Sequence, residues 1–125
     1  MDIEKRITAA WQGRISGCLL GKPVEGLSMR EGYEKLNVFL NEAQSFPLRD
    51  YINSVEHDYI RGINKKCMKG KIEKAEIDDD ITYTVLCLMM LERYGLELKS
   101  EDVARTWLNM LPAGATFTAE REAYL

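Results

Sequence analysis

The sequence predicts an all-α protein, and three observations carry this prediction. Apolar residues recur at helical spacing from Ile3 to Leu19. A second stretch, 80–94, is apolar on every side of a helix and stops at Gly95. No segment shows the sustained apolar–polar alternation of a half-buried strand. The length of 125 residues suits one domain, 1–125, and an apolar content of 46% is enough for a core.

The first predicted helix begins after Asp2, whose carboxylate can cap the first turn. Gly21 followed by Pro23 is its predicted end, because glycine favours a helix stop and proline cannot donate the helical hydrogen bond. The stretch GKPVEG, 21–26, is therefore predicted to be a loop, and this loop carries Glu25.

The second predicted helix opens with a capping box of Ser28 and Glu31 and runs to about Leu40. The loop SFPLRDYIN follows, with Pro47 as its helix breaker. The stretch 53–75 is polar, basic and interrupted by glycines, so it is expected to be mostly loop with a short helix.

The strongest predicted element is the helix 80–94, which we expect to be buried at the centre of the fold because it is apolar all round. Gly95 is its natural C-terminal stop. Ser100 is the expected cap of a fourth helix, which Pro112 ends. Thr118 is the expected cap of a fifth helix near the end of the chain.

Composition excludes several classes of protein. The net charge is −3 with both signs interspersed, which leaves no electrostatic footprint for nucleic acid or an anionic membrane. The N-terminus is charged and amphipathic rather than a signal peptide, and no apolar run reaches about 18 residues. The cysteines are odd in number and form no C-x-x-C pair. Cys18 and Cys87 are predicted to be buried free thiols, which favours a reducing, cytoplasmic location.

Three consecutive aspartates, Asp78, Asp79 and Asp80, precede the apolar stretch ITYTVLCLMML. A cap and first-turn acids explain one or two of them, at about 0.3–1 kcal/mol per carboxylate. Two carboxylates about 5 Å apart repel by roughly 3 kcal/mol at an effective dielectric constant of about 20. Because the helix is expected to be buried, we expect this aspartate triplet to need a cation or to take up protons.

Oxygen ligands suit hard ions such as Mg²⁺, Mn²⁺ or Ca²⁺. An EF-hand does not fit, because counting from Asp78 places Tyr83 where glycine is needed and Met89 where glutamate is needed. A zinc site is disfavoured because His57 is the only histidine. Three side chains do not complete a metal shell, so Glu25 is the next candidate. The alternative for Glu25 is an ordinary exposed loop acid.

Two stretches carry a resemblance to a known family. GRISGCLLGKPVEG (13–26) is similar to the first motif of the ADP-ribosylglycohydrolases, the group that includes the dinitrogenase reductase-activating glycohydrolase. IDDDITYT (77–84) is similar to that family's Thr/Ser-Asp-Asp-Thr metal motif. FPLRDYI and LPAGATFTAEREAY also resemble a bacterial branch of the family. The resemblance covers essentially the whole chain but only the N-terminal portion of the family's longer domain.

The resemblance implies an orthogonal multi-helix bundle, incomplete in this chain, with a pair of Mg²⁺ or Mn²⁺ ions. Family members hydrolyse the glycosidic bond between ADP-ribose and an acceptor, so the implied partner is ADP-ribose or an ADP-ribosylated substrate. By the same resemblance, Asp78, Asp79 and Asp80 fall on the first metal ligands. Glu25 falls on the glutamate beside the bound ribose, and a catalytic role is implied for it.

The chain departs from the family pattern in ways that leave alternatives open. Asp78 stands where the family has Thr or Ser, Ile81 where it often has Thr, and Cys18 where it often has Asp. The family's second metal motif, an Asp-x-Asp far downstream of the first, has no counterpart after the triplet in this sequence. We therefore expect an incomplete site without turnover, in a fragment or a truncated product. The acceptor and the choice of divalent ion stay open.

Two further readings come from other classes of protein. The chain is alternatively a non-catalytic helical module that binds ADP-ribose or a protein partner. It alternatively completes its cleft by self-association, driven by apolar surface that missing helices leave exposed. The candidate residues for that surface are Met89, Met90, Trp107 and Leu108, although such a stripe is more often plain core.

Overall fold

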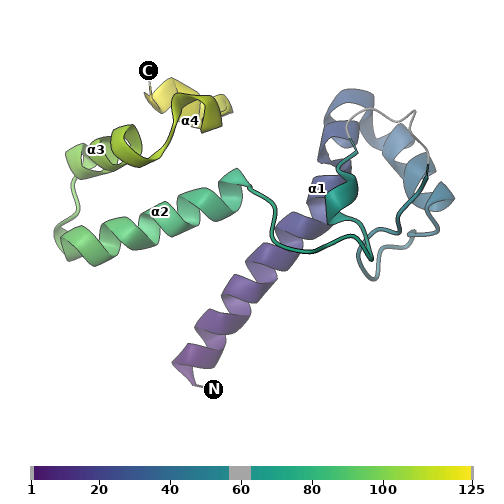
Figure 1. Cartoon of the computed structure of the whole chain (residues 1–125), viewed down its shortest axis with the longest axis horizontal. Coiled ribbons are helices and arrows are strands. Elements are labelled where there is room, and N and C mark those ends of the chain that lie inside the picture. Colours follow the sequence, from purple (N-terminus) through teal and green to yellow (C-terminus); the bar gives the residue numbers. More distant parts are fainter. Residues whose placement is uncertain (1, 57–62, 125) are drawn as a thin grey trace. The chain divides into compact units, whose positions relative to one another are not determined.

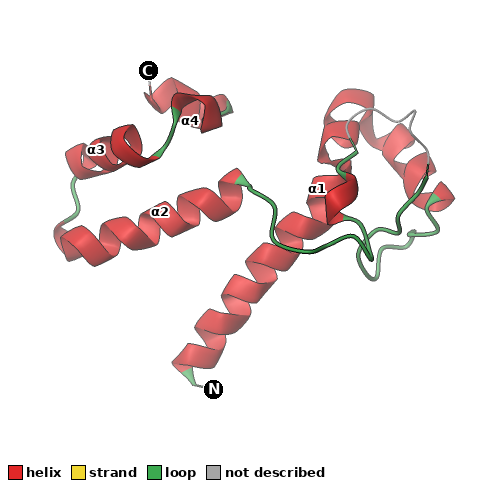
Figure 2. Cartoon of the chain, viewed as in Figure 1, coloured by secondary structure: helices red, strands yellow, loops and turns green. Residues whose placement is uncertain are grey.

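The computed structural model describes residues 2–56 and 63–124, and in this part of the chain it confirms the all-α class (Figure 1). The segment 57–62, which includes His57 and Gly62, lies outside the described residues. Within them the regular structure is helical, without a strand (Figure 2). The helices are α1 (Ile3–Glu42), η1 (Lys65–Cys67), α2 (Asp79–Tyr94), η2 (Gly95–Glu97), α3 (Ser100–Met110), η3 (Ala113–Ala115) and α4 (Thr118–Tyr124).

The chain divides into two compact units. The N-terminal unit is Met1–Glu76 and the C-terminal unit is Ile77–Leu125. Each is described by itself below.

Helix α1 continues through the stretch that was predicted to be a loop. The residues of GKPVEG are helical, and Pro23 lies inside the helix and is buried. A proline inside a helix removes one hydrogen bond at a cost of about 3 kcal/mol. Burial of Leu19, Pro23 and Leu27 along one side offsets that cost. The predicted end at Gly21 and Pro23 is therefore wrong, because tertiary packing outweighs the local helix-breaking signal.

The break in α1 occurs at Gly32 instead. Its backbone has φ 78° and ψ −176°, a conformation that is essentially confined to glycine. Ser28 does not cap a new helix, because its hydroxyl donates to the carbonyl of Glu25 at 3.1 Å within the first helical stretch. The predicted capping box with Glu31 is thus wrong, while a second helical stretch does follow and ends at Glu42.

The core of the N-terminal unit joins α1 to the loops that follow it. Its buried members are Leu27, Phe39, Ala43, Ile52 and Met68, each no more than 4% exposed. Met68 directly follows η1, so contacts between residues far apart in sequence anchor the basic stretch. The predictions of a loop around Pro47 and of a short helix in 53–75 are confirmed for the described residues.

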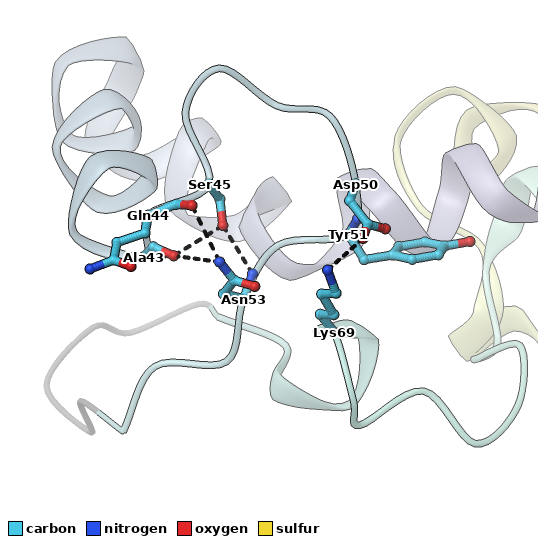
Figure 3. Close-up of polar contacts among 7 residues, drawn as sticks. All are labelled: Ala43, Gln44, Ser45, Asp50, Tyr51, Asn53 and Lys69. Carbon is cyan, nitrogen blue, oxygen red and sulfur yellow. Dashed lines mark hydrogen bonds and ion pairs between the residues drawn. The ribbon is translucent and has the colours of Figure 1, made fainter.

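Asn53 fastens the loop to the end of α1 (Figure 3). Its side-chain amide donates to the carbonyls of Ala43 at 3.0 Å and Gln44 at 3.3 Å. The hydroxyl of Ser45 accepts from the Asn53 backbone N–H at 3.0 Å and donates to the Ala43 carbonyl at 3.1 Å. These bonds satisfy carbonyls at a helix C-terminus that have no partner within the helix.

In the C-terminal unit, α2 packs on α3 and α3 packs on α4 (Figure 1). The rings of Tyr83 and Trp107 lie 5.2 Å apart at 53°, a tilted aromatic pair that joins α2 to α3. Gly95 has φ 64° and ends α2, as predicted. The predicted starts of α3 and α4 are confirmed to within one residue, since Ser100 and Thr118 are their first helical residues.

Helix α2 is not buried all round, and this corrects the sequence-based expectation. Leu86 and Met90 are buried, whereas Val85, Leu88 and Leu91 are 40%, 46% and 43% exposed. The described part of the C-terminal unit packs α3 against α2, so it covers one stripe of α2 and leaves the other sides open. Helix α2 is apolar on all sides, but the described part of this unit buries only part of that apolar surface.

The cysteines also differ from expectation. Cys67, on which no prediction was made, is fully buried, whereas Cys18 is half-buried and Cys87 is exposed. Apolar neighbours in sequence did not decide burial, because the exposed sides of α2 are apolar too. Among the described residues, no helix combines the length and the apolar character that a membrane span requires.

Candidate metal centre

Asp78 starts α2 by capping it. Its backbone is extended, with φ −149° and ψ 138°, and its carboxylate oxygen Oδ1 accepts from the Asp80 backbone N–H at 3.1 Å. The Asp78 carbonyl accepts from the Thr82 N–H at 2.9 Å, which is the first helical bond. Asp79 and Asp80 occupy the first turn, where the helix dipole favours negative charge. The structural role that the sequence allowed is thus observed for Asp78.

The three aspartates differ in exposure. Asp78 is 9% exposed, Asp79 is half-buried and Asp80 is exposed. Exposure to solvent therefore increases along the triplet from Asp78 to Asp80. The Asp78 carboxylate is both buried and used as a cap, so its orientation is restricted.

The spacing of two of the carboxylates permits a shared ion. A carboxylate oxygen of Asp78 and one of Asp80 lie within 4.8 Å of each other. Two oxygens on one ion lie up to about 4 Å apart for Mg²⁺ and about 5 Å for Ca²⁺, from bond lengths of about 2.0–2.1 and 2.3–2.6 Å. The limit of 4.8 Å lies inside the Ca²⁺ range and slightly above the Mg²⁺ range. Acids at such a spacing also occur without an ion, so the geometry permits a metal without requiring one.

The nearby hydroxyl of Thr84 is already used. It donates to the Asp80 carbonyl at 2.8 Å, as a threonine inside a helix commonly does. The oxygen donors at this helix start are therefore the carboxylates of the triplet. On a metal ion they would fill only part of the shell, which would leave several positions for water or for other ligands.

Glu25 occupies a different setting from the one predicted. It lies inside α1, not in a loop, and its side chain is exposed. Glu25 belongs to the N-terminal unit and the triplet to the C-terminal unit. A shared role for Glu25 and the triplet remains a prediction.

The structure also reveals two polar atoms that the sequence did not single out. Tyr83 Oη and Glu120 Oε2 are both buried and have no hydrogen-bond partner within the described part of the chain. Burial, then the negative charge of Glu120, then that of Asp79, raise the pKa of the Tyr83 hydroxyl above its ordinary value of 10.0. No sequence signal links positions on α2 and α4, so only the folded arrangement shows this pair.

Comparison with known proteins adds no family assignment. No family model, curated protein or solved structure matches the chain.

Proposed function

We propose that this chain carries the first metal-binding segment of an ADP-ribosylglycohydrolase-type hydrolase. The proposal is supported by the two similar motifs in the family's order and by one structural observation. That observation is the pair of carboxylate oxygens of Asp78 and Asp80 within 4.8 Å at the start of an apolar helix.

The two acids would hold an ion in different ways. Asp78 is fixed by its capping bond to the Asp80 N–H, so one of its oxygens keeps its place. Asp80 is exposed and adds a second carboxylate from the first turn of α2. Asp79, which is half-buried in the same first turn, adds a third negative charge. This set of carboxylates at one helix start suits Mg²⁺ or Mn²⁺, which favour carboxylate oxygens and retain several waters.

The implied reaction is hydrolysis of the bond between ADP-ribose and an acceptor. Bound divalent ions would supply orientation of the ribose hydroxyls and a more acidic water. The carboxylates of the triplet would offset positive charge that develops on the sugar as its glycosidic bond breaks. Glu25 is the proposed contact to the ribose. Because the sequence has no Asp-x-Asp second motif, we propose binding without turnover for these 125 residues.

Calorimetric titration with MgCl₂ and MnCl₂ tests the metal half of the proposal. We expect Asp80→Asn to weaken binding at least about 10-fold, because it removes the charge of a direct ligand. Glu97→Gln is the matched control, since it removes one charge from an exposed acid outside the triplet. No heat of binding in the unmodified chain, or equal loss in the two variants, would contradict the proposal.

The second candidate function is a module that binds ADP-ribose without any catalysis, and the missing second metal motif favours it. Titration with ADP-ribose in MgCl₂ and then in excess chelator separates the two. Metal-dependent binding that Glu25→Gln weakens and Glu31→Gln does not supports the hydrolase-type site. Binding that survives the chelator supports the module.

A further inference from the structure

The stretch 63–75, which follows the segment 57–62, is strongly basic. Residues 63–75 contain five lysines and one glutamate, a local charge of +4 in a chain whose net charge is −3. The function proposed above uses none of these lysines. Their placement in the N-terminal unit therefore needs its own explanation.

The backbone of this stretch is firmly anchored. Cys67 and Met68 are both 0% exposed, and Met68 belongs to the hydrophobic core. The Lys69 N–H donates to the Ile52 carbonyl at 2.8 Å, and the Asn64 N–H donates to the Pro23 carbonyl at 3.1 Å. The lysines on either side of the buried pair thus project from a frame that is fixed to α1.

Two local turns set the direction of the lysine side chains. The Asn64 side-chain oxygen accepts from the Lys66 N–H at 3.1 Å and caps η1. Gly70, with φ 76°, allows a turn in which the Lys71 N–H donates to the Met68 carbonyl at 2.9 Å. These turns give the stretch a defined local shape on both sides of its buried residues.

Lys69 makes an ion pair with Asp50. Its Nζ lies 2.6 Å from the Asp50 carboxylate (Figure 3). The hydrogen bond from Lys69, then the one from the Tyr51 backbone N–H, lower the pKa of Asp50 from its ordinary 3.8. The charge of Lys69 is therefore compensated locally.

The other four lysines line one hollow, which we call the lysine pocket. Its volume is about 420 Å³, within the roughly 300–1,000 Å³ range of small-molecule sites. Four lysines and two glutamates give its lining a net charge of +2. The lining residues are Ser54, Lys65, Lys66, Lys71, Glu73, Lys74 and Glu76.

We propose that the lysine pocket binds a small phosphate-bearing anion of about two negative charges. Lysine ammonium groups bind phosphate as point charges, and the Ser54 hydroxyl adds a neutral donor. Among the described residues, Lys66, Lys71 and Lys74 make no ion pair, so their charges are available to a ligand. The two glutamates in the lining disfavour a long polyanion such as nucleic acid. The pocket lies within the N-terminal unit and uses neither Glu25 nor the triplet, so this inference is independent of the proposed function.

Calorimetry with inorganic diphosphate at low salt tests the proposal. We expect the double variant Lys71→Gln/Lys74→Gln to bind diphosphate at least about 10-fold more weakly, because two of the four lysine charges are gone. The matched control is Lys5→Gln/Lys35→Gln, which removes the same charge from exposed lysines of α1 outside the pocket. All four side chains are exposed, so both variants are expected to fold, and their unfolding temperatures verify this.

Three outcomes would overturn the inference. The first is no binding of diphosphate to the unmodified chain at low salt. The second is equal weakening in the two double variants, which would mean a bulk charge effect rather than a pocket. The third is tighter binding of a single-stranded oligonucleotide than of diphosphate, which would replace the small anion with nucleic acid.

Discussion

The two units of the molecule are built on different kinds of contact. The N-terminal unit is held by long-range contacts, in which Leu27 of α1 shares a core with Ile52 and Met68. The C-terminal unit is held by contacts between successive helices, with few fully buried apolar residues and two buried polar atoms without partners among those described. Stability is thus expected to concentrate in the first unit, while the second bears the acidic helix start.

The same contrast explains where sequence signals succeed. In the C-terminal unit, caps and stops such as Asp78 and Gly95 act as their residue types predict. In the N-terminal unit, the helix continues through Pro23, and the break occurs at Gly32. Local sequence signals decide the structure where contacts between neighbouring elements dominate. Where long-range contacts dominate, packing overrides those signals.

The largest expected effect is on the core of the N-terminal unit. Phe39 is 2% exposed, so Phe39→Ala should lower the free energy of unfolding by about 3–5 kcal/mol, through lost burial and a cavity. Val38→Ala is the control, because Val38 is 54% exposed on the same helix and should cost less than about 1 kcal/mol. Urea denaturation measures both. Equal losses would contradict a tightly packed core around Phe39 in the N-terminal unit.

Two glycine substitutions test whether α1 breaks at Gly32 or at Gly21. Gly32→Ala should destabilise by about 1–3 kcal/mol, because alanine does not tolerate φ 78° with ψ −176°. Gly21→Ala should stabilise by roughly 0.5–1 kcal/mol, because Gly21 is helical and an added Cβ meets no atom within 4 Å. Thermal unfolding gives the sign of each change. If Gly32→Ala stabilised the protein and Gly21→Ala destabilised it, the result would favour the loop that the sequence predicts for 21–26.

A third prediction separates the structural and ligand roles of the triplet. Without metal, Asp78→Ala should cost about 0.5–2 kcal/mol, because the cap on the Asp80 N–H is lost. Asp80→Ala removes an exposed first-turn charge that favours the helix dipole, and it should cost no more than about 1 kcal/mol. Denaturant unfolding in chelator compares them. A larger loss for Asp80→Ala would argue against the capping role of Asp78.

The smallest expected effect concerns the buried hydroxyl of Tyr83. Tyr83→Phe should be neutral or stabilise by up to about 1 kcal/mol, because it removes a buried group without a partner among the described residues. Near neutral pH the hydroxyl is protonated in both folded and unfolded states, so the comparison there is independent of its titration.

The raised pKa of Tyr83 gives this prediction a pH signature. Above pH 10.0 the unfolded tyrosine loses its proton while the folded one keeps it, so stability falls as pH rises through the folded-state pKa. The Tyr83→Phe variant lacks this loss, and the gap between the two proteins should widen from about pH 10 upward. A constant gap across that window would contradict the raised pKa.

The sequence predicts much of the fold and a smaller part of the candidate site. The helical class, the start of α2 at the triplet and its stop at Gly95 follow from spacing and capping chemistry. The path of α1 through Pro23 does not, because it depends on burial against residues outside the helix. The charge of Glu120 acting on Tyr83 and the four lysines around one hollow are likewise products of tertiary structure.

The most direct test of the account is to locate a divalent ion by nuclear magnetic resonance. Substoichiometric Mn²⁺ broadens amide signals close to where it binds. The account predicts that signals of residues 77–82 broaden first and that Asp80→Asn abolishes this preference. Equal broadening at the acidic starts of α1 and α3, which also carry first-turn acids, would show that the triplet is only a helix cap.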